Sequence, residues 1–259
     1  MVNRPAPGES PAEQLANYLQ FIEDRRDAHT KTKASDGALR RYAKHLVPQG
    51  FRGRARFVVT DVARPAAAAK AKRITAEHAA AGKDLLLHIG SGGEHKDGWI
   101  NIDLAGDPVE VPWNLKRSLP FPDASAAALF SEHLLEHIPL HGVVNVLRDC
   151  HRVLKPGGIM RVGVPDAGRM LRSYTEDGKD FIATTRPDRP QLMLAVQELF
   201  YWYDHCTMYD EEMLKWLLNA TGFTGEIHRR EPGETDLPVA APDTPKRWDE
   251  TLYVETVRP

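Results

Sequence analysis

The chain has little of what defines disulfide-rich, secreted or membrane-spanning proteins. Cys150 and Cys206 are its only cysteines in 259 residues, which argues against a disulfide framework and a cysteine-based zinc site and fits a reducing cytoplasm. No apolar run approaches the roughly 20 residues that a membrane-spanning helix needs. The first residues, MVNRPAPGESPAEQ, lack the apolar core of a signal peptide. The composition therefore predicts a cytoplasmic protein with no membrane partner.

A strong charge of either sign is also missing. Lys and Arg total 34 against 36 Asp and Glu, giving a formal net charge of −2 and a pI of about 6.6. A basic field of the kind that attracts nucleic acid is absent, so we expect no nucleic-acid partner. Hydrophobic residues make up 42% of the chain, which is ordinary for a globular protein.

The first part of the chain predicts helices rather than an independent domain. Residues 13–46 indicate two helices, residues 47–57 are basic and turn-rich, and an Ala-rich helix is expected over Arg64–Ala81. The apolar content of residues 1–82 is too low for a separate core. We therefore expect a helical extension or cap, followed by one domain over residues 83–259.

From Asp84 onward, strand and helix patterns alternate, which predicts an α/β fold with a doubly wound, mostly parallel Rossmann-like sheet. The expected strands are Leu85–Ile89, Trp99–Ile102, Ala127–Phe130, Met160–Val164, Glu226–Arg230 and Leu252–Thr256. The expected helices are Leu140–Leu154, Gly168–Glu176, Gln191–Tyr203 and Glu211–Ala220. The last two strands are joined by a turn-rich link, so we expect them to form an antiparallel pair.

A glycine-rich turn is the most informative local pattern. The first strand ends in His88-Ile89-Gly90, and Ser91, Gly92 and Gly93 follow it, while the second strand ends at Asp103. Ligands of open α/β sheets bind outside the carboxyl ends of the strands. Glycines allow close backbone approach, and a carboxylate can accept hydrogen bonds from a ribose diol. The stretch therefore predicts a site for a nucleoside-type cofactor.

The crossover between this turn and Asp103 is short. A dinucleotide site places the acidic residue about 20 residues beyond the glycines, after a full helix whose N-terminus holds phosphate. Here residues 94–98 leave room for a turn only. This spacing argues against NAD and suits a cofactor without phosphates.

Three further patterns follow in order. They are Asn114-Leu115 with LPFPD at residues 119–123, FSEHLLEHIP at residues 130–139, and RVLKPGG at residues 152–158 before a strand that ends in VPD. The succession resembles the class I S-adenosylmethionine-dependent methyltransferases, in particular the group with LPFPD…EHxLEH…VLKPGG motifs, over about residues 85–225.

The resemblance implies S-adenosylmethionine as the cofactor. It places the glycine turn against the methionine part of the cofactor, Asp103 at the ribose hydroxyls and Asn114 with Leu115 at adenine. Residues that follow the fourth strand would face the reactive sulfonium. The cofactor-binding set that we predict is His88, Gly90, Ser91, Gly92, Asp103, Asn114, Leu115, Ser131 and Glu132.

Two histidines are candidate general bases for methyl transfer, because an imidazole can take a proton from an acceptor near neutral pH. They are His133, which alternatively packs on the cofactor, and His205, which follows an aromatic run in a predicted substrate lid at about residues 167–209. The run either stacks on an acceptor ring or forms a buried helix end. The substrate-binding set that we predict is His133, Tyr201, Trp202, His205 and Tyr209.

Residues 133–137 also match the zinc-peptidase pattern H-x-x-E-H. That pattern needs a sustained helix that brings both histidines to one ion, and Pro139 disfavours such a helix. We therefore expect no metal site, and we expect Glu136 and His137 to cap or pack the following loop. Arg161, Arg169 and Arg172 are expected on the solvated surface.

The predicted function is methyl transfer to a small-molecule acceptor, with the hydroxyl of a sugar or secondary metabolite favoured by the histidines and aromatic residues. N-methylation of a small molecule is an alternative, and so is a catalytically inactive cofactor-binding or regulatory protein of the same fold. A zinc hydrolase is disfavoured. The N-terminal helices are expected to cover the active site, to mediate a homodimer, or both.

Overall fold

The computed structural model of the chain describes residues 17, 19–21, 24, 49–104, 109–175 and 180–259. Most of the two helices expected within residues 13–46 therefore lies outside the described residues. The chain divides into two compact units, residues 1–55 with 170–199, and residues 56–169 with 200–259. Among the described helices, none combines the length and apolar character that crossing a membrane requires.

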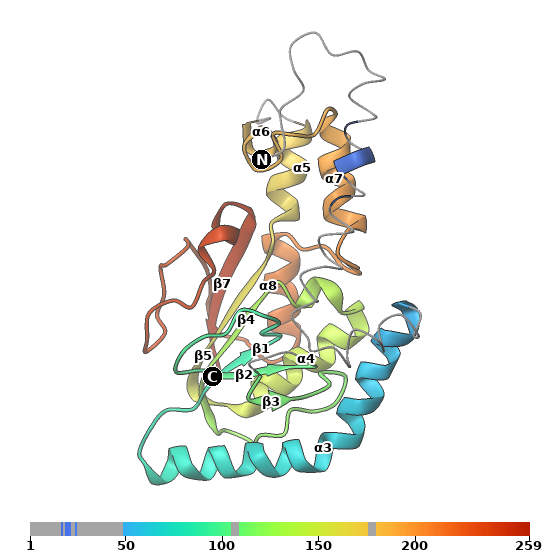
Figure 1. Cartoon of the computed structure of the whole chain (residues 1–259). Helices are drawn as coiled ribbons and strands as arrows, with labels where there is room; N and C mark the ends of the chain where they lie inside the picture. Colours follow the sequence, from blue (N-terminus) through green and yellow to red (C-terminus); the bar gives the residue numbers. More distant parts are fainter. Residues whose placement is uncertain (1–16, 18, 22–23, 25–48, 105–108, 176–179) are drawn as a thin grey trace. The chain divides into compact units, whose positions relative to one another are not determined.

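The second unit is built on a seven-stranded sheet with the order β3-β2-β1-β4-β5-β7-β6 (Figure 1). Strands β1 to β5 run parallel to their neighbours, whereas β7 is antiparallel to both β5 and β6. This arrangement confirms the predicted mostly parallel sheet with an antiparallel C-terminal pair. The strands are β1 Leu86–Ile89, β2 Ile100–Asp103, β3 Val111–Pro112, β4 Ala126–Glu132, β5 Leu154–Pro165, β6 Ile227–Arg230 and β7 Thr251–Val257.

The helices differ from the expectation mainly at the N-terminal side. Helix α3 spans Gln49–Ala80, so the expected turn-rich segment at residues 47–57 is largely helical and that prediction is wrong. An isolated glycine costs a helix only about 1 kcal/mol, and the Arg and Ala residues around Gly50 and Gly53 are good helix formers. The other helical elements of this unit are η1 Leu135–His137, α4 Leu140–Val153, α8 Glu211–Ala220 and η2 Pro245–Glu250, and α5 Ala167–Thr175 begins in this unit and continues into the other.

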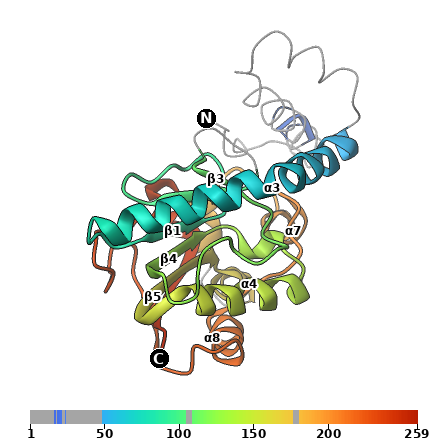
Figure 2. The same cartoon turned by 90° about the horizontal axis from the view of Figure 1, so that it is seen from below.

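The two faces of the sheet pack against different material. Leu87 and Ile89 of β1 belong to a large apolar cluster that takes in buried residues of α3, α4 and α8, the helices seen beside the sheet in Figure 2. Leu86, on the opposite face of the same strand, belongs to a second cluster of strand and loop residues that includes Phe130 and Leu237. Because successive side chains of a strand point to opposite faces of the sheet, the four residues of β1 contribute to the apolar clusters on both faces.

Arg161 joins the sheet to the long link between β6 and β7. It lies on β5 with 0% of its side chain exposed, and its Nε donates to Asp243 Oδ1 at 2.7 Å while its Nη1 donates to Glu255 Oε1 at 2.8 Å. The expected surface position of Arg161 is wrong, because β5 is a central strand and both carboxylates come from segments far away in the sequence. A buried charge of this kind must be paired to be tolerated.

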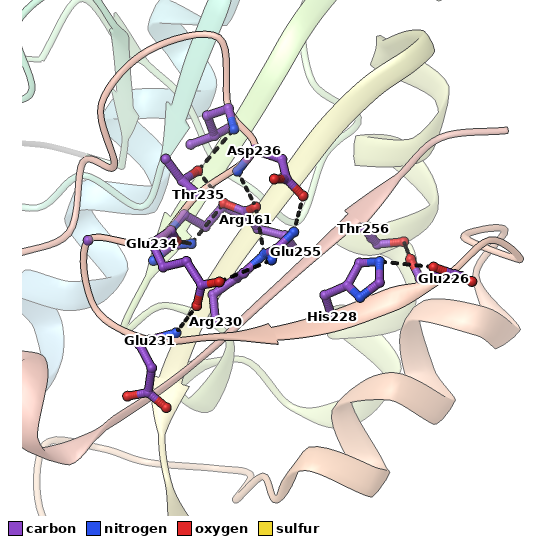
Figure 3. A network of polar contacts seen from close by, with 12 residues as sticks. Arg161, Glu226, His228, Arg230, Glu231, Glu234, Thr235, Asp236, Glu255 and Thr256 are labelled. Atoms are coloured by element: carbon purple, nitrogen blue, oxygen red, sulfur yellow. Dashed lines mark hydrogen bonds and ion pairs between the residues drawn. The ribbon is translucent and has the colours of Figure 1, made fainter.

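The network continues outward from Glu255 on β7 (Figure 3). Glu255 Oε2 accepts from the backbone N–H of Asp236 at 2.8 Å and lies 3.3 Å from Arg230 Nε, and Glu255 Oε1 accepts from the Thr235 hydroxyl. Arg161 also donates to the backbone carbonyl of Glu234 at 2.8 Å. Charged groups thus hold residues 231–243 against the β5–β7 part of the sheet.

The first unit contains most of the segment that the sequence predicts as a substrate lid. Its described helices include α6 Asp180–Thr185 and most of α7 Leu192–Tyr201, and a buried ion pair joins Arg189 Nη2 to Glu198 Oε2 at 2.8 Å. The lid role stays a prediction. Residues 56–82, expected as part of the helical extension or cap, fall within the unit of the sheet, and a domain boundary near residue 82 stays a prediction.

We expect Arg161→Met to lower the free energy of unfolding by about 3–5 kcal/mol, because the change leaves two buried carboxylates without their guanidinium partner. Urea unfolding measures this difference. Lys155→Met is the matched control, since Lys155 Nζ lies 3.5 Å from Asp84 Oδ1 in an exposed pair and should change stability by less than about 1 kcal/mol. Equal effects of the two substitutions would contradict the assignment of Arg161 as a buried structural ion.

Candidate active site

A cavity of about 320 Å³ opens at the carboxyl ends of β1, β2 and β4, where ligands of α/β sheets bind. It is lined by His88, Gly90, Ser91, Gly92, Gly93, Glu94, Asp103, Glu132, His133, Leu134, His137 and Arg247. A second cavity of about 360 Å³ lies against α4, away from these strand ends. The first cavity therefore holds most of the predicted cofactor residues and is the candidate site.

The glycine turn takes a backbone shape that other residues rarely adopt. Gly90 and Gly92 have φ angles of 72° and 52°, and an added Cβ on Gly90 would lie 2.7 Å from Leu134 Cδ1. The backbone N–H of Gly92 donates to Asp103 Oδ2 at 2.9 Å. The structure thus brings the turn and the carboxylate of Asp103 together at one end of the cavity.

His88 contributes a neutral imidazole to the cavity. Its Nδ1 lies 2.9 Å from Asn101 Oδ1, and the Asn101 amide nitrogen donates to the carbonyls of Lys96 and Trp99, which fixes the oxygen as the acceptor. His88 Nδ1 therefore carries the proton and Nε2 is an acceptor. Burial lowers the pKa of His88 to about 4, against a weaker opposing effect of the hydrogen bond.

Glu132 lies at the end of β4 with its carboxylate already engaged. Oε1 accepts from the backbone N–H of Thr244 at 2.9 Å and from the Tyr253 hydroxyl at 2.6 Å, and Oε2 lies 3.2 Å from Arg247 Nη1. Burial alone would raise the pKa of Glu132, but these hydrogen bonds and Arg247 together lower it. Glu132 is therefore ionised at neutral pH and ties β4 to the β6–β7 link.

Two of the predicted cofactor residues have buried hydroxyl groups with no protein partner. The Oγ atoms of Ser91 and Ser131 are buried, and neither has a hydrogen-bond partner within the described part of the chain. Buried polar groups normally find a partner. Ser91 lines the cavity, so a polar group of a bound ligand fits there.

Asn114 and Leu115, predicted to contact adenine, do not line this cavity. Asn114 Nδ2 lies 3.4 Å from Asp61 Oδ1, and Asn114 Oδ1 accepts from the backbone N–H of Lys116 at 3.0 Å. Leu115 lines the second cavity. Their adenine role stays a prediction, because the present contacts of Asn114 are internal ones.

His133 lies in the cavity wall in a strained conformation, with a φ angle of 52°. Its Nε2 is 2.9 Å from Thr251 Oγ1, and this hydroxyl itself donates to the carbonyl of Arg247. Nε2 therefore carries the proton, and Nδ1 faces Glu136 Oε1 at 3.4 Å. Burial is the main cause that lowers the pKa of His133, to about 3.

Glu136, which the sequence predicted only to cap or pack the following loop, is a buried residue of the site. Its side chain is 0% exposed, burial raises its pKa to about 8, and neither carboxylate oxygen has a hydrogen-bond partner among the described residues. The sequence feature that could have indicated Glu136 is the second Glu-His pair of the EHLLEH motif, Glu136-His137. The helix that the zinc-peptidase pattern needs does not form, since residues 135–137 make one 3-10 turn.

The predicted substrate residues separate into three environments. Tyr209 is 1% exposed, belongs to the main apolar cluster and donates its hydroxyl to the Leu135 carbonyl at 3.3 Å, so it packs the core. Tyr201 is 80% exposed, and neither it nor Trp202 lines the cavity. The His205 ring lies 4.9 Å from the ring of His137, which is a cavity residue.

Residues 109–162, which include β4, η1 and α4, match the family model of the methyltransferase domain. Over these residues the chain is similar to a methyltransferase domain. The match confirms the resemblance to class I S-adenosylmethionine-dependent methyltransferases that the motifs indicate, and the glycine turn, Asp103 and the unpartnered hydroxyl of Ser91 suit their cofactor. A search of curated proteins finds no match.

Solved structures resemble the chain at a distance. One is a possible exported protein from Bordetella parapertussis, with 14% identity, a TM-score of 0.35 and coverage of 57% of this chain and 43% of that one. Another is an S-adenosylmethionine-dependent methyltransferase from Archaeoglobus fulgidus, with 13% identity, a TM-score of 0.42 and coverage of 72% and 94%. A third is phosphoethanolamine N-methyltransferase 2 from Haemonchus contortus, with 14% identity and a TM-score of 0.42. The match covers 68% of this chain and 49% of that one.

We expect Asp103→Asn to weaken binding of S-adenosylmethionine by roughly 10- to 100-fold, because a hydrogen bond to a charged group contributes about 1.5–3 kcal/mol. Calorimetric titration with S-adenosylmethionine and S-adenosylhomocysteine measures the loss. Asp97→Asn is the control, since Asp97 is fully exposed in the same crossover and should leave both affinities unchanged. Unchanged affinity in Asp103→Asn would remove Asp103 from the cofactor site.

The unit of the sheet should lose stability in acid through His88. Its pKa is about 4 when folded and 6.5 when free, so the unfolded chain binds the proton first as the pH falls. The stabilisation is complete above pH 6.5 and is lost as the pH falls through 4, by about 3 kcal/mol. His88→Gln should flatten this part of the pH dependence of unfolding, measured with urea. A variant profile parallel to the wild type would contradict the buried neutral state.

Proposed function

We propose that the chain transfers a methyl group from S-adenosylmethionine to a hydroxyl group of a small molecule, such as a sugar or secondary metabolite. The observation that carries the proposal is the cavity itself, in which the glycine turn and the Asp103 carboxylate meet the histidines that follow β4. The family match over residues 109–162 supports the reaction class. The choice of a hydroxyl acceptor is argued from the side chains that line the cavity.

In this proposal the β1 and β2 ends hold the cofactor. Asp103 accepts hydrogen bonds from the ribose hydroxyls, and the open space at Gly92 lets the backbone approach the ligand. The acceptor Nε2 of His88 and the hydroxyl of Ser91 take polar groups of the methionine end. When bound, the cofactor supplies an electrophilic methyl group on a sulfonium.

The acceptor binds on the side of the cavity formed by the histidines. Both ring nitrogens of His133 face protein groups, Thr251 at 2.9 Å and Glu136 at 3.4 Å. His133 therefore helps to hold the cavity wall in place and does not serve as the base. His205 does not line the cavity, but its ring lies 4.9 Å from that of His137, which does, and we take it as the candidate base that accepts the hydroxyl proton. Holding the hydroxyl in line with the methyl group supplies much of the rate.

Two alternatives share the cofactor site. An amine acceptor needs no base, since positioning and desolvation suffice, and an inactive regulatory protein would bind the cofactor without turnover. A small-molecule biosynthetic role in the cytoplasm and a homodimer formed through the N-terminal region belong to the same proposal. The acceptor assay below separates these cases.

We expect S-adenosylhomocysteine and a methylated product when the full chain is incubated with S-adenosylmethionine and hydroxyl acceptors. Mass spectrometry identifies the product and the methylated atom. His205→Asn should lower kcat by about 10²- to 10⁴-fold, the range for loss of a general base, without changing cofactor affinity. His228→Asn is the control, because His228 is half exposed on β6 and lies outside the cavity.

The outcomes discriminate between the candidates. Methylation of amines alone would replace O-methylation with N-methylation. Cofactor binding without any product from hydroxyl or amine acceptors would favour the non-catalytic protein. Full activity in His205→Asn would exclude His205 from the reaction.

A further inference from the structure

Three side chains that the proposed cofactor site does not use gather beside its cavity. Glu136 and His137 come from η1, and His205 comes from the loop after α7, so all three belong to the unit of the sheet. Each offers one ligand atom within 4.8 Å of the others. The rings of His137 and His205 meet edge to face, with centroids 4.9 Å apart.

Backbone contacts hold this cluster together. The N–H groups of Cys206 and Thr207 donate to the carbonyl of Glu136 at 2.6 and 3.2 Å, which fastens the loop of His205 to η1. Tyr203 and Asp204 reach this loop through φ angles of 63° and 60°. Two successive left-handed residues without glycine are costly, and such strain is concentrated at functional sites.

Glu136 points to a ligand independently of the cluster geometry. Its carboxylate is fully buried and both oxygens lack a hydrogen-bond partner within the described residues, although Oε1 lies 3.4 Å from His133 Nδ1 and 3.9 Å from His137 Nε2. A buried carboxylate is normally hydrogen-bonded, paired with a cation or bound to a metal. The side chains that approach Glu136 here are imidazoles, which are themselves metal ligands.

We propose that Glu136, His137 and His205 bind one divalent transition-metal ion of the Zn²⁺ type. Two imidazoles and one carboxylate form the donor set of zinc sites that keep a coordination position open, whereas Mg²⁺ and Ca²⁺ prefer oxygen ligands alone. The ion neutralises the buried carboxylate.

The location gives the ion a role that rests on the proposed methyl transfer. His137 lines the cavity, so an open coordination position faces the acceptor side. An acceptor hydroxyl bound there loses its proton more easily, because a metal ion lowers the pKa of a coordinated O–H group. With the ion bound, His205 acts as a ligand in place of the general base, the hydroxyl proton passes to water, and loss of His205 lowers turnover by removing the ion.

Metal binding can be measured without cofactor or acceptor, so its outcome is separate from that of the methyltransferase assay. We would strip the full chain with a chelator, titrate it with ZnCl₂ by calorimetry, and record the visible spectrum with CoCl₂. We expect one ion per chain. His205→Asn and Glu136→Gln should weaken zinc binding by more than the roughly 10- to 100-fold that follows loss of an outer-shell partner.

The controls are His228→Asn and Cys206→Ser, which should bind zinc as the wild type does. Cys206 is an exposed thiol next to His205, so its replacement tests whether sulfur carries the binding. Far-UV circular dichroism confirms that His205→Asn, a loop change, remains folded. Absence of a stoichiometric ion in the wild type, or unchanged affinity in folded His205→Asn, would overturn the proposal.

Discussion

The pairing of Arg161 with Asp243 and Glu255 is the constraint on which the rest of the site depends. The guanidinium is buried in the middle of the sheet and holds the link between β6 and β7 across one face. The same link carries Thr244 and Arg247, whose contacts hold Glu132 at the end of β4. Lys96 of the glycine crossover also donates to Thr244 Oγ1 at 2.9 Å. These buried charged groups therefore fix the position of the cavity wall.

Much of the fold was predictable, because strands and amphipathic helices carry their period in the sequence. The strand ends that place Gly90, Asp103 and Glu132 in one cavity follow from the parallel order alone. The surroundings of Arg161 were not predictable, since its carboxylate partners lie 82 and 94 residues away. The two-residue strand β3 is too short to carry a pattern of its own, and the start of α3 was missed because its glycines looked like a turn although its neighbours favour a helix.

The acceptor side shows the same limit at the level of single residues. The EHLLEH motif pointed to His133, and its second half proved to contain the fully buried Glu136. Nothing local to residues 133–137 reveals that a loop 69 residues later closes over them through Cys206 and Thr207. Tyr209 illustrates the opposite case, because it was predicted to contact the substrate and instead packs the core.

Leu134 has a consequence for how the two halves of the cavity communicate. Its side chain occupies the space that a Cβ on Gly90 would need, so the cofactor turn rests directly on the residue between His133 and η1. A displacement of the turn would therefore press on Leu134 and on the residues that follow β4, since packed interiors transmit displacement. The contact between Gly90 and Leu134 thus makes the glycine turn and the histidine wall one packed unit, in which neither part can move alone.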